Sequence, residues 1–278
     1  MLHRLISIVY YFIACGLAGF IIVNAGAATE SYGVLYEQFS PSNKADTEFK
    51  TLLETLSLGL YEGGTRKTDE LEAVVATAEH HAQRAYVGSW VLFAASVVFF
   101  VIKMAPSLFW GQSLYTKNLV AHLLGISLVF LVVGLLAPIL SLVAYTEVAL
   151  LGKVVFKYES KGVITTVLEL VRSGNIFIAG VLFAFSVVTP LVKHIFAFMA
   201  ILSSEHSVRI KYVRFLSVIG KWSMADVMVV AVLLSFFVIG EEGFSDSWLG
   251  AGLYFFTGYC VLSLITIQLI TNLKEREI

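Results

Sequence analysis

The chain has 278 residues, of which 58% are hydrophobic and 14% are charged, and its formal net charge is −1. A soluble domain has about 25% charged residues, so this composition excludes an ordinary soluble enzyme and favours an integral membrane protein. The charge balance shows no basic excess that would indicate nucleic acid as a partner. Cys15 and Cys260 both lie in apolar runs, which excludes a disulfide framework or a cysteine-based zinc site within this chain.

Six apolar runs are long enough to cross a hydrocarbon core of ~30 Å, which takes roughly 20 residues. The runs are continuously apolar rather than alternating, so the sequence predicts an all-α integral membrane protein and not a β-barrel. The first run ends in Ala25-Gly26-Ala27, which resembles a signal-peptidase site, but its length favours an uncleaved helix. In chain order the runs are residues 5–27, 86–102, 119–145, 176–201, 222–239 and 249–270.

The distribution of lysine and arginine sets the expected orientation of these spans. Segment 202–221 and the C-terminal tail are basic, whereas segment 240–248 has acids and no base. Both termini are therefore predicted to be cytoplasmic. Segment 149–173 conflicts with this orientation, because it is predicted to lie outside and yet holds several basic residues.

Residues 28–85 form the longest polar segment, and acids outnumber bases in it. Its apolar residues recur at helical spacing, so the segment is predicted to be a helical hairpin outside the membrane or a long helical extension of the second span. His80 and His81 point to different faces of a helix, so no metal site is expected there. Residues 153–159 can form a short strand, and residues 163–171 an amphipathic helix at the membrane interface.

Lys193 and Asp226 are charged residues inside predicted spans, where each needs a partner or water. At 1.5 Å per residue they lie ~12 Å and ~6 Å from the cytoplasmic ends of antiparallel helices, which predicts a Lys193–Asp226 pair, direct or through water. Ser186 and Pro190 share the face of Lys193, and Pro190 frees a backbone carbonyl near Ser186. Ser223 shares the face of Asp226. The alternative is that Lys193 extends to the interface and Asp226 caps its helix.

The last span carries a polar stripe of Tyr259, Ser263 and Thr266. Intramembrane serine and threonine often bond only to carbonyls of their own helix, which is the alternative interpretation. His122 and His194 are interpreted as packing or interface residues. These residues lack the spacing of a protease or metal centre, and the chain has no phosphate-binding loop, so an enzyme is not expected.

Two segments resemble motifs of the paraquat-inducible protein A family. They are residues 220–234, beginning Gly-Lys-Trp-Ser-Met-Ala-Asp-Val, and residues 185–193, Phe-Ser-Val-Val-Thr-Pro-Leu-Val-Lys. The resemblance covers about residues 120–271. It implies a four-helix module with tetraspanin- or claudin-like topology, residues 118–278, after an N-terminal addition, residues 1–117. It also implies an intramembrane polar network, which consists of Ser186, Lys193, Ser223, Asp226 and Ser263. The further motif residues are Pro190, Gly220, Trp222 and Met224.

The resemblance implies an inner-membrane protein of a Gram-negative envelope that handles membrane lipids with a mammalian-cell-entry (MCE) type partner. Members often carry two modules and zinc ribbons with Cys-x-x-Cys pairs. This chain has one module and no such pair, so no metal or other cofactor is expected, and the lone module is a candidate for homo-oligomerisation. The leading hypothesis is loading or release of lipid, with Lys193 and Asp226 as a switch. Two alternatives stay open, a non-transporting scaffold or envelope-stress protein that recruits a partner through its outer hairpin and an ion-coupled small-molecule transporter.

Overall fold

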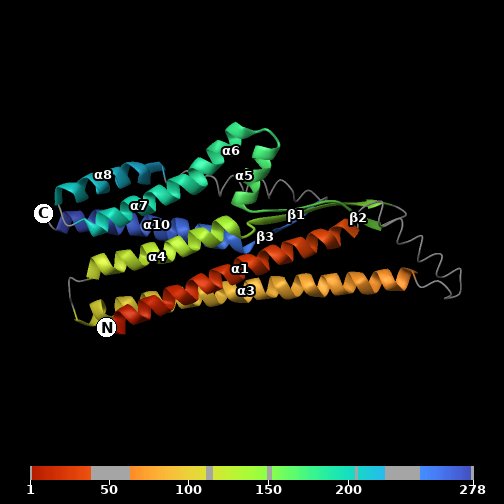
Figure 1. Ribbon diagram of the computed structural model, residues 1–278, viewed down its shortest axis with the longest axis horizontal. Coiled ribbons are helices and arrows are strands. Elements are labelled where there is room, and N and C mark those ends of the chain that lie inside the picture. Colours follow the sequence, from red (N-terminus) through yellow and green to blue (C-terminus); the bar gives the residue numbers. More distant parts are fainter. Residues whose placement is uncertain are drawn as a thin grey trace.

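The computed structural model describes residues 2–38, 63–110, 115–148, 152–203, 206–222 and 245–276. Long helices run side by side, and a small sheet lies at one end (Figure 1). Both termini lie at the opposite end. Within the described residues, five helices are long and apolar enough to cross a membrane by length and composition. The chain is therefore a multi-pass helical membrane protein, as predicted, while the fifth predicted span, residues 222–239, lies almost wholly outside the described residues.

The first two helices form an antiparallel hairpin along one side of the molecule (Figure 1). They are α1 (Leu2–Gln38) and α3 (Gly63–Trp110), and each continues well past its predicted span. Residues 63–85 are continuous with the second span, so of the two predicted forms it is the long helical extension that the structure shows for this part. The turn predicted between the two polar helices falls mainly outside the described residues.

The centre of the bundle is the pair α4 (Tyr115–Leu136) and α10 (Ala251–Arg276). Their backbones approach closely, because a Cβ placed on Gly134 would lie 2.7 Å from the backbone nitrogen of Phe256. A Cβ on Gly258 would likewise lie 2.9 Å from the ring of Phe130. Lipid tails are as apolar as the helices, so the hydrophobic effect does not hold membrane helices together. Close packing does, and small residues at helix crossings allow it.

The third helix ends earlier than predicted. Pro138 lacks a backbone N–H and disfavours a helical conformation in the residue before it, so α4 stops at Leu136 and the chain becomes extended. Strand β1 (Leu140–Val148) therefore occupies the end of the predicted span 119–145. Gly250 N–H donates to Ile139 O at 2.8 Å, and Gly252 N–H to Pro138 O at 2.9 Å, which ties this turn to the start of α10.

Strand β1 is the middle strand of a small antiparallel sheet with the order β2-β1-β3. The other strands are β2 (Gly152–Lys161) and β3 (Ser245–Leu249), and Leu140 pairs with Lys161 on one side and with Leu249 on the other. The predicted strand at residues 153–159 is confirmed, whereas β1 and β3 were not predicted. The sheet thus adds a small β-structure to the predicted helical fold.

The fourth span is preceded by an amphipathic helix, α5 (Val163–Arg172), which buries Val163 and Val167 and confirms the predicted element. Gly174, with a φ of +81°, makes the turn that follows, a conformation that glycine adopts without strain. The span itself consists of α6 (Ile176–Phe183), the π-helical turn η1 (Ala184–Val188) and α7 (Thr189–Leu202).

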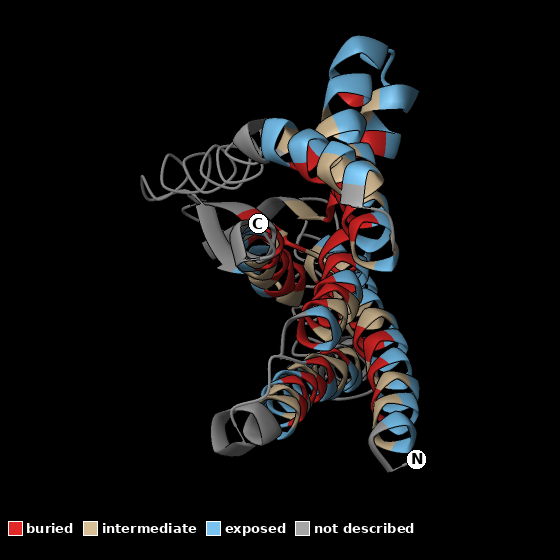
Figure 2. Cartoon of the chain, turned by 90° about the vertical axis from the view of Figure 1, so that its left-hand side faces the viewer, coloured by how far each residue is buried: buried red, intermediate tan, exposed pale blue. Residues whose placement is uncertain are grey.

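Helix α8 (His206–Trp222) folds back along α7 (Figure 1). The predicted basic segment is thus helical, and it buries Val213 and Leu216 against the bundle. Phe215 contacts Phe196 of α7, with 4.2 Å between ring centroids. In the end view of Figure 2, buried residues line the facing sides of the helices and exposed residues line the outer sides.

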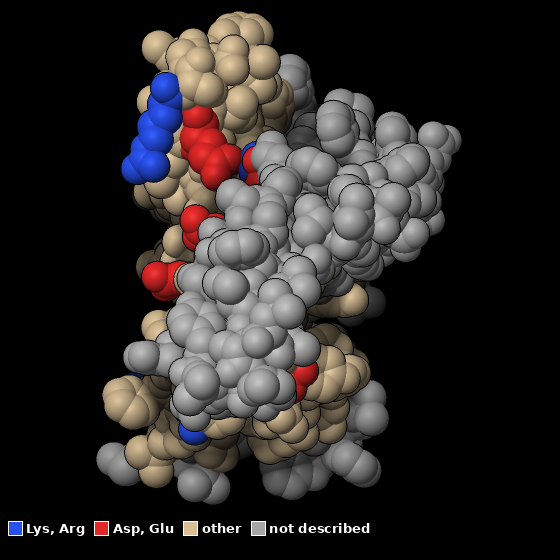
Figure 3. All heavy atoms as spheres, turned by 90° about the vertical axis from the view of Figure 1, so that its right-hand side faces the viewer, with Lys and Arg blue, Asp and Glu red and all other residues tan. Residues whose placement is uncertain are grey.

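Large apolar side chains lie on these outer sides, among them Phe12 and Phe177, which are 82% and 83% exposed. That surface is the part that hydrocarbon would cover. Seen from the sheet end, a few charged side chains lie among uncharged ones, and at one edge a basic side chain lies beside acidic ones (Figure 3). Lys161 of β2 forms ion pairs with Glu159 at 3.0 Å and with Glu169 of α5 at 3.1 Å.

Candidate functional site

Three of the predicted network residues lie in the described part of the chain, and all three are buried. Ser186, Lys193 and Ser263 are 2%, 1% and 4% exposed. Lysine is almost never so completely buried in a protein unless its charge is compensated. The alternative interpretation, in which Lys193 extends to the membrane interface, does not fit this burial.

The backbone next to Ser186 departs from the α-helix, as the position of Pro190 predicted. Residues 184–188 form a π-helical turn, and the N–H and hydroxyl of Thr189 both bond to the carbonyl of Ala184, the hydroxyl at 2.9 Å. Because Pro190 has no N–H, the carbonyl of Ser186 lacks its usual helical donor. Single π-turns within α-helices occur frequently at functional sites.

His194, which follows Lys193, joins three helices. Its Nδ1 lies 3.0 Å from Pro190 O and its Nε2 lies 2.8 Å from the hydroxyl of Ser127 in α4. Its ring lies against Tyr259 of α10, with 5.6 Å between centroids. The sequence indicates His194 only as a packing or interface residue and gives no signal for Ser127. No signal in either segment could have paired them, since they are 67 residues apart.

This arrangement satisfies His194 in two protonation states. A carbonyl can only accept, so Nδ1 carries a proton and donates to Pro190 O. In the neutral ring, Nε2 accepts the proton of Ser127. In the charged ring, Nε2–H donates to Ser127, whose hydroxyl then donates to Leu124 O, 3.0 Å away. The site can therefore gain or lose a proton without leaving a buried polar atom unbonded.

The predicted stripe on α10 is buried along its whole length. Tyr259 and Thr266 are both 0% exposed, and Ser263 lies between them. Thr266 donates to Leu262 O at 2.6 Å, which is the own-helix bond that the alternative interpretation expected. Buried polar residues thus lie on α4, η1, α7 and α10, and contacts join those of α4, α7 and α10 through His194. The term polar core is used here for the set Ser127, Ser186, Lys193, His194, Tyr259 and Ser263.

The remaining network residues are not placed. Ser223, Met224 and Asp226 lie outside the described residues, so the Lys193–Asp226 pair stays a prediction. Gly220 and Trp222 lie in the last turn of α8.

Two further histidines lie at contacts of α1. Tyr11 contacts His122 of α4, with its hydroxyl 3.3 Å from both Nδ1 and the backbone carbonyl. His81 of α3 lies 3.0 Å from Oδ1 of the buried Asn24. His81 is therefore half-buried, while His80 is exposed. Within the described residues, no group of three or more His, Cys, Asp or Glu side chains could hold a metal ion.

Comparison with known proteins identifies the family. The family model described as Paraquat-inducible protein A matches residues 127–274, which is more than half of the chain. The chain belongs to the paraquat-inducible protein A family. The matched region includes every residue of the polar core, and α1 and α3 lie before it.

Two curated relatives match over shorter stretches. Lipophilic envelope-spanning tunnel protein A of Escherichia coli is 28% identical over 102 residues, which is 34% of this chain and 23% of the relative. A probable intermembrane transport protein of Haemophilus influenzae is 29% identical over 126 residues, which is 41% of this chain and 30% of the relative. The match thus spans less than a third of the length of each. No solved structure matches the chain significantly.

Proposed function

We propose that this protein is an inner-membrane component of envelope lipid transport, which loads or releases lipid through its polar core. The observation that carries the proposal is the complete burial of Lys193, one helical turn after Pro190 and the π-turn, in a membrane-spanning helix. An ionisable residue inside a span is costly and usually marks a pathway or a switch. The names of the two relatives, a tunnel protein and an intermembrane transport protein, support transport across the envelope.

The switch is the polar core together with Asp226. Burying a charge in hydrocarbon is costly, whereas the proposed attraction between Lys193 and Asp226 lowers that cost. Where these effects nearly balance, a proton can bias the packing of α7 against α4 and α10, as protonation does in other conformational switches. The π-turn gives α7 a place to bend, because its backbone bonds are already rearranged there.

The orientation and the partner belong to the same proposal. The termini and α8 lie at the end opposite to the sheet (Figure 1). Because α8 is basic, we infer that this end faces the cytoplasm. The charged sheet end then faces an MCE-type partner that carries the lipid onward. With a single module, two copies of this chain assemble to serve one partner.

Variants at Lys193 test this function. Lys193→Met keeps the length of the side chain and removes its charge, and Lys211→Met on the exposed side of α8 is the matched control. A deletion strain complemented with each variant is compared for envelope integrity and for transfer of a radiolabelled phospholipid between its membranes. Lys193→Met and Asp226→Asn should each abolish transfer at wild-type protein levels in the membrane, whereas Lys211→Met should not. Wild-type transfer by Lys193→Met, or a loss that merely follows disappearance of the protein, would contradict the switch.

A further inference from the structure

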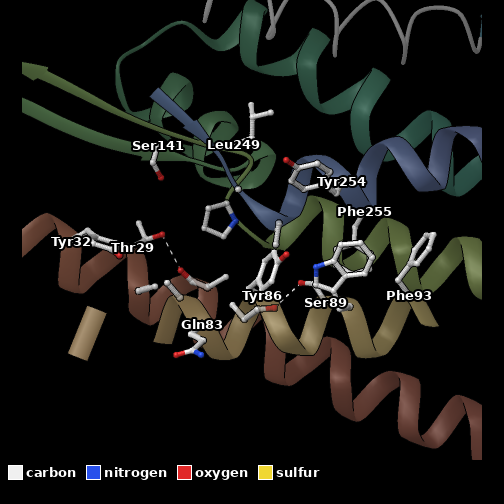
Figure 4. Close-up of a pocket in the computed structure, with 18 of the residues that line it drawn as sticks. Thr29, Tyr32, Gln83, Tyr86, Ser89, Phe93, Ser141, Leu249, Tyr254 and Phe255 are labelled. Carbon is white, nitrogen blue, oxygen red and sulfur yellow. Dashed lines mark hydrogen bonds between the residues drawn. The ribbon is translucent and has the colours of Figure 1, made fainter. Parts of the chain in front are cut away.

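A large cavity lies where the N-terminal hairpin meets the family module. It has a volume of about 790 Å³, within the range of ~300–1,000 Å³ that small-molecule sites have. One wall comes from α1 and α3 and the other from α4, the sheet and the start of α10 (Figure 4). Since α1 and α3 precede the family match at residues 127–274, one wall of this cavity comes from residues outside that match.

The lining changes from polar to aromatic along the cavity. In Figure 4, Thr29, Gln83 and Ser141 lie toward one side of the cavity together with Tyr32, and Phe93 lies at the other side. Phe93, Phe130 and Phe255 lie further along α3, α4 and α10, toward the middle of the bundle. A membrane lipid changes from polar to apolar in the same way, with its head group near the membrane surface and its acyl chain in the hydrocarbon.

The polar end of the cavity offers hydrogen-bond acceptors. Thr29 donates its hydroxyl proton to Ala25 O at 2.9 Å, and Ser89 donates to Ala85 O at 2.7 Å. Ser141 donates to Ser160 at 2.9 Å, and Ser160 lies 3.3 Å from Thr29. A hydroxyl has one proton and two lone pairs. Thr29, Ser89 and Ser141 therefore use their protons within the protein and keep lone pairs for a ligand that donates.

The described lining holds no charged side chain. Burial raises the pKa of Tyr158 in this lining, which keeps its phenol neutral. An ionised group is costly to bury where no opposite charge meets it, so the part of a ligand inside the cavity is uncharged. The lining also holds donors, among them the amide of Gln83 and the indole N–H of Trp90, so an uncharged group that both donates and accepts fits it. A phosphate would find no opposite charge among the described lining residues.

The entrance faces the surface that lipid covers. Tyr86 and Trp90 of α3 and Tyr254 of α10 are 63%, 58% and 66% exposed, and all three line the cavity. Tyrosine and tryptophan are enriched where hydrocarbon meets water, because each ring has an apolar body and a polar atom. Helices α3 and α10 make few contacts with each other, so the two sides of this entrance are separate.

We propose that the cavity binds one lipid from the adjacent leaflet, with a hydroxyl-bearing, uncharged polar region against Thr29, Ser89 and Ser141 and an acyl chain against the aromatic wall. The proposal rests on the proposed transport of lipid and gives that process a site for the lipid before or after it passes the polar core. The tail leaves one apolar environment for another, so hydrogen bonds and shape decide which lipid binds.

Photolabelling of the full chain in phospholipid nanodiscs tests the site. The probes are diacylglycerol and phosphatidic acid, each with the same diazirine at the end of one acyl chain. Diacylglycerol should label peptides that contain Phe93, Phe130 or Phe255, and it should label them about three- to tenfold more than phosphatidic acid does, the range that one or two hydrogen bonds confer. Equal labelling by both probes, or labelling spread evenly over the lipid-facing helices, would overturn the proposal.

Two pairs of variants make the test specific. Ala82→Phe fills the cavity, and Ala94→Phe adds the same ring to an exposed position of α3 outside it. Labelling by diacylglycerol should fall about tenfold in Ala82→Phe and stay unchanged in Ala94→Phe. Ser89→Ala should reduce the preference for diacylglycerol while leaving total labelling by phosphatidic acid unchanged. Unchanged labelling of a folded Ala82→Phe variant would refute the site.

The same assay separates this proposal from the proposed function. Lys193→Met lies outside the cavity and should label like the wild-type protein even where lipid transfer is lost. If transfer needs Lys193 but no variant changes the labelling, the transport role stands and the cavity is not its site. If labelling behaves as expected but transfer does not need Lys193, the cavity stands and the switch fails.

Discussion

Two contacts of the central helix α4 differ in kind. Against α10, the backbones themselves meet, because Gly134 leaves no room for even a Cβ beside Phe256. Against α1, the contact is made by side chains, with the hydroxyl of Tyr11 occupying the space over Gly125 beside His122. The first contact lies inside the family match and fixes one geometry. The second joins the added hairpin to the module, and the large cavity lies further along α1, where Ala25, Ala28, Thr29 and Tyr32 line it.

The difference indicates that the module has a rigid centre and that the hairpin is attached to it more loosely. A backbone contact cannot adjust to a larger residue without separation of the two helices, whereas the end of a long side chain can rotate away. The cavity lies on the adjustable side. A ligand can therefore enter there without disturbing α4 and α10.

The largest effect is expected at the backbone contact. Gly134→Ala should destabilise the protein by at least ~1–3 kcal/mol, the usual cost of overpacking, because its Cβ would overlap Phe256. Gly26→Ala is the control, since nothing lies within 4 Å of a Cβ there, and it should be neutral or slightly stabilising. Thermal unfolding in detergent and the amount of protein in the membrane measure both. Equal stability of the two variants would show that the backbones of α4 and α10 do not meet at Gly134 as described.

A smaller effect is expected at the side-chain contact. Gly125→Ala places its Cβ against the hydroxyl end of Tyr11, which can move, so the cost should be about 1 kcal/mol. Shortening the tyrosine by Tyr11→Leu should remove most of that cost in the double variant, because the two positions share one contact. Additive effects of the two changes, measured by thermal unfolding, would show that α1 does not pack on Gly125 as described.

Loss of the hydrogen bond between α4 and α7 should cost as much stability as Gly125→Ala does, or less. Ser127→Ala removes the partner of His194 Nε2 and should cost about 1 kcal/mol, whereas Ser127→Thr keeps a hydroxyl and should cost less. Both variants are compared by unfolding and by lipid transfer at several pH values. If Ser127→Ala leaves the pH dependence of transfer unaltered, His194 is a packing residue, as the sequence suggested.

The smallest effect is expected at the charged sheet end. Burial alone would lower the pKa of Lys161, but Glu159 and Glu169 outweigh it and the pKa is raised from its usual 10.5. The ion pairs are partly exposed, so Lys161→Met should cost only ~0.2–1 kcal/mol. This stabilisation is complete below pH 10.5 and is lost as the pH rises through the raised pKa. Unfolding midpoints of wild type and variant should therefore converge at high pH, and a constant difference would exclude the ion pairs as its source.

Composition and periodicity predicted the parts of the fold that depend on nearby residues. Apolar runs located the spans, alternation located β2, and amphipathic spacing located α5. The burial of Lys193 and the irregular backbone before Pro190 followed from the cost of a charge in hydrocarbon and from the missing N–H of proline.

Features that join distant segments were not predictable. The end of α4 at Leu136 depends on Pro138 and on pairing with two strands that come later in the chain. The Ser127–His194 bond and the cavity bring together residues from several elements, each of which alone is an ordinary polar or aromatic residue of a membrane helix. Asp226 falls outside the described residues, so its predicted pairing stays a prediction.

The length of α3 has a mechanical consequence for assembly. Its 48 residues span about 72 Å at 1.5 Å per residue, more than twice the ~30 Å of a hydrocarbon core. Helix α1 packs along α3 and also contacts the sheet. There the rings of Tyr36 and Tyr158 stack, with 5.1 Å between their centroids. A second protein that approaches this end cannot lie flat on the bilayer. It must either have a recess that accepts the projecting end of α3 or bind beside that end, off the axis of the bundle.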